Sequence, residues 1–189
     1  MLILASASPR RQELLRNAGI GFTVQAADID ETPLAGESPR DCAERLAREK
    51  ALAIFRSHPE DYVLGADTIV VVDGTILGKP RDGDDAARML RMLSGRTHAV
   101  ITGVCIVRTG VSDDEELTAS ESTLVTMSEI SDNEIRDYIA TGEPMDKAGG
   151  YAIQGIASRW IPRIEGDYGN VVGLPVALVY AMLRKQGAV

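Results

Sequence analysis

Apolar and polar residues alternate along the chain in patterns that predict short strands and amphipathic helices. Residues 2–5 form an apolar run with the length of a buried strand. Ser8 and Pro9 then suit the N-cap and first position of a helix, and Asn17 and Gly19 suit its end. The chain is therefore expected to begin with a strand, a tight turn and a helix, and the start of such a helix favours an anion.

A second amphipathic helix is predicted after a weaker strand at residues 22–26. It begins at Ser38-Pro39 and extends to about residue 55, with apolar residues repeating on one face. Charged residues occupy the other positions: Glu44, Arg45, Arg48, Glu49 and Lys50. They are most simply a solvated face with weak ion pairs, and spacing alone does not distinguish Lys50 from its neighbours.

Residues 62–72 are the most hydrophobic segment and are rich in β-branched residues, which predicts a central strand buried on both faces. Asp67 interrupts this segment. A buried carboxylate is costly unless it is paired, hydrogen-bonded or metal-bound, so Asp67 is either a functional group or a structural cap. Small residues before it, including Gly65, leave room for something to approach the backbone. Asp73-Gly74 predicts a hairpin turn into residues 75–77.

The remaining elements follow from the same signals. They are a helix from Asp82 to near Gly95, strands at about 96–109 and 117–127 around a polar loop at 110–116, a helix behind a capping box at Ser131–Glu134, a loop at 141–155, a strand at 160–164 and a closing helix after Pro175. The two long strands are expected to form an antiparallel pair, which gives an α/β fold with α+β character. No repeat or linker is visible, so we expect a single domain over residues 1–189.

Composition and charge exclude several classes of function. The chain has 189 residues, 44% of them hydrophobic, and no apolar run approaches the length of a membrane span. A net charge of -8 argues against binding a nucleic-acid polymer. Cys42 and Cys105 have no metal-like spacing, so reduced buried thiols in a cytoplasmic protein are expected. With only two histidines, a hard cation on oxygen ligands is favoured over zinc.

Basic residues, hydroxyls and carboxylates gather at three predicted strand ends. Residues 6–11 hold Ser6, Arg10 and Arg11, residues 28–31 are acidic, and residues 67–79 run from Asp67 to Lys79. Arginine and lysine beside carboxylates suit a phosphate group with a divalent cation between the phosphate and the acids. A buried aspartate beside that cation could orient or deprotonate water. This pattern predicts a phosphoryl-type hydrolase without defining its substrate.

Seven motifs together resemble the Maf family of nucleoside triphosphate pyrophosphatases. They are SASPRR at 6–11, RLAREKA at 45–51, GADTIV at 65–70, GKPRD at 78–82, SGRTH at 94–98, GEPMDKAGGYAIQG at 142–155 and GDYGNVVGLP at 166–175. The resemblance implies an elongated mixed sheet flanked by helices, similar to the inosine triphosphate pyrophosphatase fold, with the site in a cleft between two lobes. It also implies hydrolysis between the α and β phosphates, a divalent metal (Mg or Mn, with Co as a further candidate) and a homodimer.

The resemblance also assigns roles to residues of this chain. Asp67 matches the family's proton acceptor, and Lys50 and Lys79 match catalytic positions. Ser6, Arg10, Arg11, Thr68 and Gln154 match substrate-binding positions, of which Arg11, Thr68 and Gln154 are associated with base choice. Glu31 and Asp67 are the expected metal ligands, although Asp28 and Asp30 compete with Glu31 for its place.

The loop at 146–155 resembles the family branch that acts on dTTP and UTP. Gln154 can present an acceptor and a donor side by side, which matches N3–H and O4 of thymine and uracil but not cytosine. Two alternatives stay open on the sequence. One is a 7-methyl-GTP pyrophosphatase, and the other is a non-catalytic nucleotide sensor that regulates cell division or septum formation.

Overall fold

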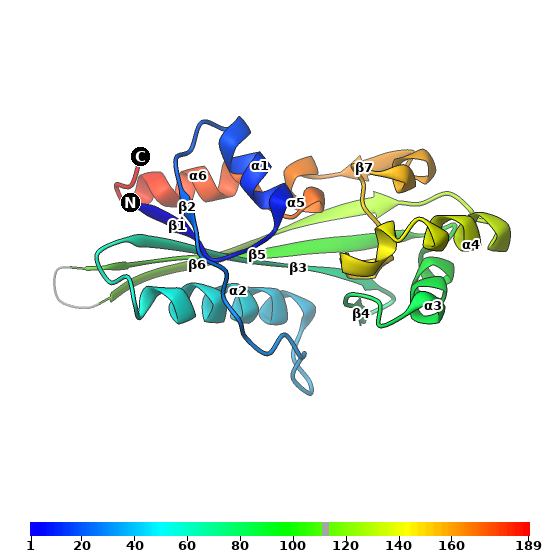
Figure 1. The fold of residues 1–189 in the computed structure, drawn as a ribbon, viewed down its shortest axis with the longest axis horizontal. Helices are drawn as coiled ribbons and strands as arrows, with labels where there is room; N and C mark the ends of the chain where they lie inside the picture. Colours follow the sequence, from blue (N-terminus) through cyan, green and yellow to red (C-terminus); the bar gives the residue numbers. More distant parts are fainter. Residues whose placement is uncertain (111–113) are drawn as a thin grey trace. The chain divides into compact units, whose positions relative to one another are not determined.

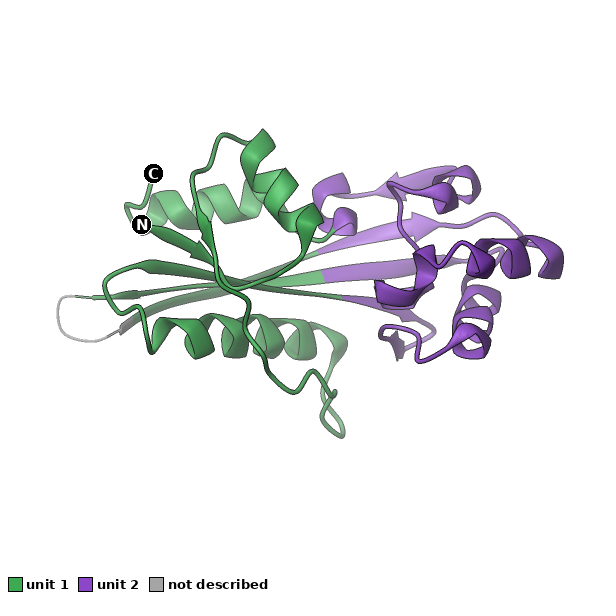
Figure 2. Cartoon of the chain, viewed as in Figure 1, with its two compact units in different colours: residues 1–68, 102–121, 173–189 green, residues 69–101, 122–172 purple. Residues whose placement is uncertain are grey.

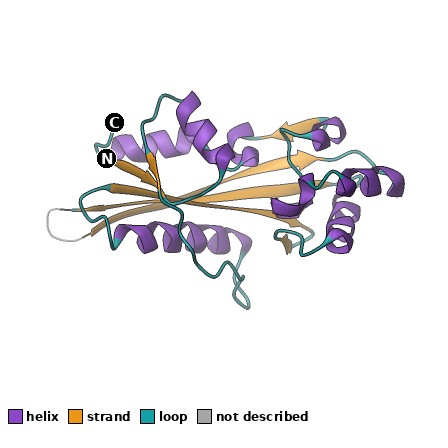
Figure 3. Cartoon of the chain, viewed as in Figure 1, coloured by secondary structure: helices purple, strands orange, loops and turns teal. Residues whose placement is uncertain are grey.

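The structure is a computed structural model that describes residues 1–110 and 114–189. Within those residues a seven-stranded sheet, whose strands are orange in Figure 3, has the order β2-β1-β3-β5-β6-β7, and β4 pairs with β3. The strands are β1 (Leu2–Leu4), β2 (Thr23–Val24), β3 (Tyr62–Val72), β4 (Thr75–Leu77), β5 (Thr97–Thr109), β6 (Asp114–Thr126) and β7 (Arg163–Glu165). β1 is parallel to β2 and β3, whereas β4 and β7 are antiparallel to β3 and β6. The predicted mixed α/β class is confirmed.

Along the chain, the helices lie between and after the strands. The α-helices are α1 (Pro9–Asn17), α2 (Pro39–Phe55), α3 (Gly83–Leu93), α4 (Asp132–Ala140), α5 (Tyr168–Val172) and α6 (Val176–Lys185). The described residues also contain three short 3-10 helices, η1 (Glu143–Asp146), η2 (Ala148–Gly150) and η3 (Ile156–Trp160). The side chains of Ser8, Ser38, Asp82 and Ser131 accept backbone hydrogen bonds at the N-caps of α1, α2, α3 and α4, which confirms these four predicted starts.

The contacts of the chain divide it into two compact units, coloured separately in Figure 2. Unit 1 comprises residues 1–68, 102–121 and 173–189, and unit 2 comprises residues 69–101 and 122–172. Each unit has its own hydrophobic cluster or clusters. The expectation of a single domain over 1–189 stays a prediction.

In unit 1, alternate residues of each central strand serve two different faces of the sheet. On one face, Leu4 and Leu64 pack in a cluster with α1 and α6, and on the other face Ile3 and Val63 pack in a cluster with α2 (Figure 1). This is the period-two pattern of a sheet covered on both sides. Cys42 and Cys105 are free and buried in this unit, as expected from their spacing.

Two glycines let α2 approach the sheet backbone closely. A Cβ at Gly65 would lie 2.0 Å from the carbonyl oxygen of Ala47, and one at Gly103 would lie 2.2 Å from that of Ala43. Neither position can hold a larger residue without moving the helix. The space expected before Asp67 is therefore filled by α2, and this contact fixes the height of the helix over β3.

Unit 2 has a separate core that includes Val70, Leu90, Tyr138 and Trp160. The rings of Tyr138 and Trp160 meet edge to face with centroids 5.3 Å apart. The hairpin predicted at Asp73-Gly74 is confirmed, because both residues have a positive φ and the Val72 and Thr75 positions pair across the turn.

Three sequence predictions differ from the structure in unit 2 and at the start of β6, and one helix was not predicted. Residues 141–155 contain η1 and η2 rather than only loop, because short 3-10 turns need no apolar periodicity. The strand predicted at 160–164 begins at Arg163, and α5 was not predicted. β6 begins at Asp114, within the predicted loop 110–116, and residues 111–113 of that loop lie outside the described residues.

Candidate active site

The predicted phosphate turn has the geometry of a capped helix start. The backbone N–H of Arg11 donates to the hydroxyl of Ser8 at 3.4 Å, and Pro9 begins α1. Arg11 is buried at 9% exposure, whereas Arg10 is half-buried on the same turn. The turn therefore carries one guanidinium held inside the protein and one that reaches its surface.

Arg11 makes hydrogen bonds to three neutral oxygens of unit 1. Its Nη1 donates to Ser6 Oγ at 3.0 Å, its Nη2 to Thr68 Oγ1 at 3.1 Å and its Nε to the carbonyl oxygen of Gly173 at 2.8 Å. Burial lowers the pKa of this guanidinium from its ordinary value, and the nearby Asp67 carboxylate partly opposes that shift. A buried cation held by neutral acceptors still attracts an anion, and its orientation is already set.

Thr68 connects this arginine to the central strand. Its hydroxyl also lies 2.9 Å from that of Thr102 on β5 and can donate to the carbonyl oxygen of Gly173 at 3.4 Å. Because Thr68 directly follows Asp67 on β3, the Arg11 network and the Asp67 carboxylate are anchored at neighbouring positions of one strand.

Lys50 does not lie on the solvated face of α2 that its spacing suggested. Its side chain is 8% exposed, and its Nζ lies 2.6 Å from Asp67 Oδ1 and 2.6 Å from Glu31 Oε1. Lys50 lies one helical turn beyond Ala47, which contacts Gly65, and Gly65 and Asp67 point to the same face of β3. The close approach of α2 at Gly65 therefore brings Lys50 to Asp67.

The structure distinguishes two of the three competing acidic residues. Glu31 contacts Lys50 beside Asp67, whereas Asp30 accepts hydrogen bonds from the backbone and hydroxyl of Thr32 at 2.9 and 2.6 Å. Those hydrogen bonds, the hydroxyl first, lower the pKa of the Asp30 carboxyl. Arg45 of α2 contacts the segment that follows at residues 32–37. Its guanidinium donates to the carbonyl oxygen of Thr32 at 3.2 Å and forms a 2.6 Å ion pair with Glu37.

The two carboxylates around Lys50 form an acceptor pair suited to a hard cation. Within the described residues, no group of three or more histidine, cysteine or acidic side chains could hold a metal by itself. Magnesium commonly uses one or two carboxylates together with substrate phosphate oxygens and water. Glu31 and Asp67 converge on one nitrogen atom, and one ammonium between two carboxylates leaves a net negative charge. This donor set fits a divalent cation that arrives with a phosphate.

Lys79 and Gln154 belong to unit 2. Both side chains are exposed, Lys79 just after β4 and Gln154 between η2 and η3. Their segments are joined by a hydrogen bond from the backbone N–H of Gly149 to the carbonyl oxygen of Gly78 at 3.0 Å. Gln154 is the third residue of a tight turn closed by Gly155 N–H and the carbonyl oxygen of Ala152 at 3.1 Å.

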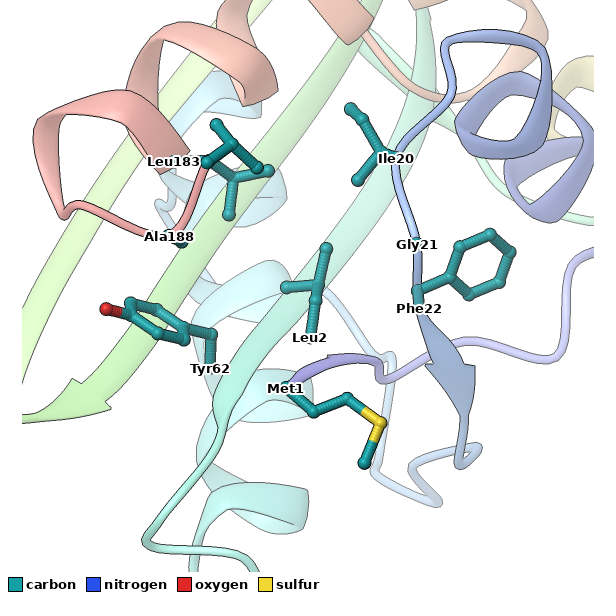
Figure 4. A pocket seen from close by; sticks show the side chains of 9 residues that line it. Met1, Leu2, Ile20, Gly21, Phe22, Tyr62, Leu183 and Ala188 are labelled. Carbon is teal, nitrogen blue, oxygen red and sulfur yellow. The ribbon is translucent and has the colours of Figure 1, made fainter.

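An apolar pocket of about 420 Å³ occurs elsewhere in unit 1 (Figure 4). Its lining includes residues near the two ends of the chain, such as Leu2 and Leu183, together with Phe22 and Tyr62. None of the predicted site residues lines it. Its apolar lining is unsuited to a triphosphate.

The sequence interpretation missed several residues that shape the site. Thr102 and the Gly173 carbonyl position Thr68 and Arg11. Gly65 had been expected to allow a close approach to the strand, but the sequence did not indicate that α2 makes this approach and so positions Lys50. The glutamate that holds the Gln154 turn, Glu143, gave no signal because it stands in a segment without periodicity.

In the part of the chain that the structure describes, every helix is too short or too polar to cross a bilayer.

A sequence profile described as "Maf-like protein" matches residues 1–186. A dTTP/UTP pyrophosphatase of Koribacter versatilis is 60% identical, with 98% of this chain and 94% of that protein covered. One of Symbiobacterium thermophilum is 54% identical over the same shares. The solved Ham1 protein of Staphylococcus aureus is 13% identical, with a TM-score of 0.52 and 98% of both chains covered, and it shows a shared fold. The chain belongs to the family of Maf-like proteins.

Proposed function

We propose that this protein hydrolyses dTTP and UTP between the α and β phosphates, giving a nucleoside monophosphate and pyrophosphate. The observation that carries the proposal is that the buried Lys50 lies between Asp67 and Glu31, and that the charges of both carboxylates act on the Arg11 guanidinium. The names of the relatives, which are 60% and 54% identical over nearly the whole chain, support the same reaction.

In this proposal Asp67 is the proton acceptor. Its side chain is 10% exposed, and one oxygen is held at 2.6 Å by Lys50, so the carboxylate is fixed in orientation. As the oxygen of a water molecule attacks phosphorus, the water proton passes to Asp67 and the bond between phosphorus and the bridging oxygen breaks, with pyrophosphate leaving. Positioned bases of this kind contribute about 10²–10⁴-fold to the rate.

Glu31 and Asp67 would hold a divalent cation, with magnesium, manganese and cobalt as candidates. When bound, this cation supplies positive charge against the phosphate oxygens and the leaving pyrophosphate. The charge of Lys50 is already balanced by the two carboxylates, so Lys50 holds them in place and adds little net charge toward the substrate.

The remaining charge of the substrate falls to the basic side chains. A nucleoside triphosphate carries about four negative charges near neutral pH. Arg11 and Ser6 are oriented by their mutual hydrogen bond, and Arg10 and Lys79 are the other proposed phosphate ligands. Arginine suits this role because its fork of donors matches two phosphate oxygens at once.

Base choice is assigned to Gln154, with Arg11 and Thr68 contributing from unit 1. The amide of Gln154 offers a carbonyl oxygen to N3–H and an amino group to O4, the pair of groups that thymine and uracil share. Cytosine reverses both groups, so a buried mispair would leave polar atoms unsatisfied.

A nucleotide panel tests the proposal. The purified protein, with magnesium or manganese, is incubated with dTTP, UTP, CTP, the purine triphosphates and 7-methyl-GTP, and pyrophosphate and monophosphate are both quantified. We expect dTTP and UTP to be the best substrates. A preference for 7-methyl-GTP would overturn the substrate assignment, and binding without any product would favour the nucleotide sensor instead.

We also propose that the protein is a homodimer and is located in the cytoplasm. The family resemblance implies the homodimer, and the two cysteines without metal-like spacing favour the cytoplasm. Sedimentation velocity of the purified full chain tests the dimer directly, and a monomer at micromolar concentration would contradict it.

A further inference from the structure

The turn that presents Gln154 is held at both ends by one pair of side chains. The backbone N–H of Ile156, two residues after Gln154, donates to the carboxylate of Glu143, at 3.1 Å to Oε1 and 3.3 Å to Oε2. The backbone N–H of Ala152, two residues before Gln154, donates to the hydroxyl of Tyr138 at 3.4 Å. That hydroxyl donates in turn to Glu143 Oε1 at 2.8 Å.

This pair connects an exposed turn to the core of unit 2. Tyr138 is 1% exposed and packs against the ring of Trp160, and burial followed by the bond to Glu143 raises the pKa of its hydroxyl. Gln154 itself is exposed. The side chain that would meet the base therefore lies at the tip of a turn whose two flanking N–H groups are fixed by buried or half-buried partners.

Gly155 shows how closely the glutamate fits the turn. A Cβ at this position would lie 2.1 Å from Glu143 Oε1, far inside van der Waals contact. Glu143 could be retained with a larger residue at 155 only if the carboxylate or the turn moved. The glycine next to Gln154 is thus required by the glutamate rather than by a special backbone angle.

We infer that Glu143 is a positioning residue for base selection, acting through the Ala152–Ile156 segment to set the orientation of Gln154. The inference rests on the proposed function, because it assigns Gln154 to the base. Amide recognition depends on direction, since a rotated amide presents its donor where the acceptor is required. With this turn free to move, the protein would still bind the phosphates but would discriminate less between uracil and cytosine.

The experiment compares kcat/KM for UTP and CTP in Glu143→Ala, Glu143→Gln and the unmodified protein. Glu143→Ala is expected to lower the UTP:CTP ratio about tenfold, mainly through a higher KM for UTP, because the base is remote from the bond that breaks. Glu143→Gln keeps one oxygen that accepts from Ile156 and should retain most of the ratio.

Glu134 provides a matched control in the same unit. It also accepts hydrogen bonds from a backbone N–H, that of Ser131 at 2.8 Å, and from an aromatic side chain, Trp160 Nε1 at 3.2 Å. Glu134→Ala should lower the melting temperature, because it breaks a capping box, and leave the UTP:CTP ratio unchanged. If Glu143→Ala likewise lowers only the melting temperature, the inference is overturned.

A double-variant cycle separates this inference from the proposed function. In Gln154→Ala the ratio should already be lost, and adding Glu143→Ala should lower it no further, since Glu143 acts through Gln154. Additive losses would contradict the inference. An unmodified protein that shows no preference for UTP over CTP would refute the proposed function first. An intact preference that survives Glu143→Ala would refute the inference alone.

Discussion

The two units hold their proposed functional side chains in opposite ways. In unit 1, Lys50 and Asp67 are nearly buried and ion-paired, and their positions depend on a helix packed onto a strand at Gly65. In unit 2, Gln154 is exposed, and its position depends on hydrogen bonds to the backbone on either side. Buried charges suit the bond-breaking chemistry common to every nucleotide, whereas an exposed turn held in one orientation suits the choice among bases. Changes at Lys50 or Asp67 should therefore affect all substrates alike, and changes at the turn should alter their ranking.

Metal removal should produce the largest effect and should not discriminate between bases. With EDTA, pyrophosphate release from dTTP, UTP and CTP is expected to fall to the assay background, because Glu31, Asp67 and Lys50 leave a negative charge facing the phosphates. Excess magnesium or manganese should restore it. Full activity after rigorous chelation would show that the basic side chains alone neutralise the substrate.

Asp67→Asn should lower kcat by at least about a hundredfold on every nucleotide, the low end for losing a positioned base. Nucleotide affinity, measured by calorimetry, should persist because the variant keeps the proposed phosphate ligands Arg11 and Ser6. Asp61→Asn is the control, since Asp61 precedes the same strand and pairs with the chain's N-terminus at 2.8 Å. Near-normal kcat in Asp67→Asn with metal supplied would make this aspartate structural.

Gln154→Glu should change the ranking of the substrates, whereas the two changes above should lower activity on all of them. The substitution removes the donor to O4 and places a carboxylate against that carbonyl oxygen, which costs about 1–3 kcal/mol if the contact is buried. Uracil substrates should lose more activity than CTP, whose amino group gains an acceptor. An equal loss on every nucleotide, seen in the same kcat/KM panel, would mean that Gln154 positions the phosphates or the loop.

The last predicted effect is an acid sensitivity of stability that originates in unit 2. His98 is 2% exposed, its Nε2 lies 2.7 Å from the hydroxyl of Tyr151, and burial lowers its pKa to about 4. The unfolded chain binds more protons than the folded one between pH 4 and the ordinary histidine value near 6.5, so stability falls as the pH drops through that range. The expected loss is about 2 kcal/mol at pH 5 relative to pH 8.

Chemical denaturation at the two pH values measures this loss. His98→Phe keeps an aromatic ring and removes the titrating group, so its stability should be nearly equal at pH 5 and pH 8. A pH dependence as steep as that of the unmodified protein would assign the acid sensitivity to other groups.

The sequence was most informative where a local signal determines the structure. The four N-caps, the strand at 62–72 and the hairpin after it agree with the structure because capping residues, β-branched runs and Asp-Gly turns act over a few residues. Lys50 was assigned to a solvated face because helical periodicity gives no information about where a neighbouring strand is buried. Its position depends on the contact of Ala47 with Gly65, which are far apart along the chain.

Contacts that form only in the folded chain also limited the prediction of the candidate site. Glu31 could not be separated from Asp28 and Asp30 by spacing, and its contact with Lys50 arises only when the loop before α2 is folded. Glu143 was missed altogether, because its partners are a helix residue, Tyr138, and a turn beyond two 3-10 helices. The motif resemblance supplied the role of Gln154 but not the side chains that hold it.

The division into two units also separates the chain's spectroscopic reporters. The chain has two cysteines and one tryptophan: Cys42 and Cys105 are buried in unit 1, and Trp160 is buried in unit 2. Burial raises the pKa of both thiols to about 11, so alkylation should require unit 1 to open. Thiol labelling and tryptophan fluorescence, followed in one denaturant series, therefore each observe a different half of the unmodified protein. Coincident transitions would mean that the halves unfold together, and separate ones would mean that either half can open alone.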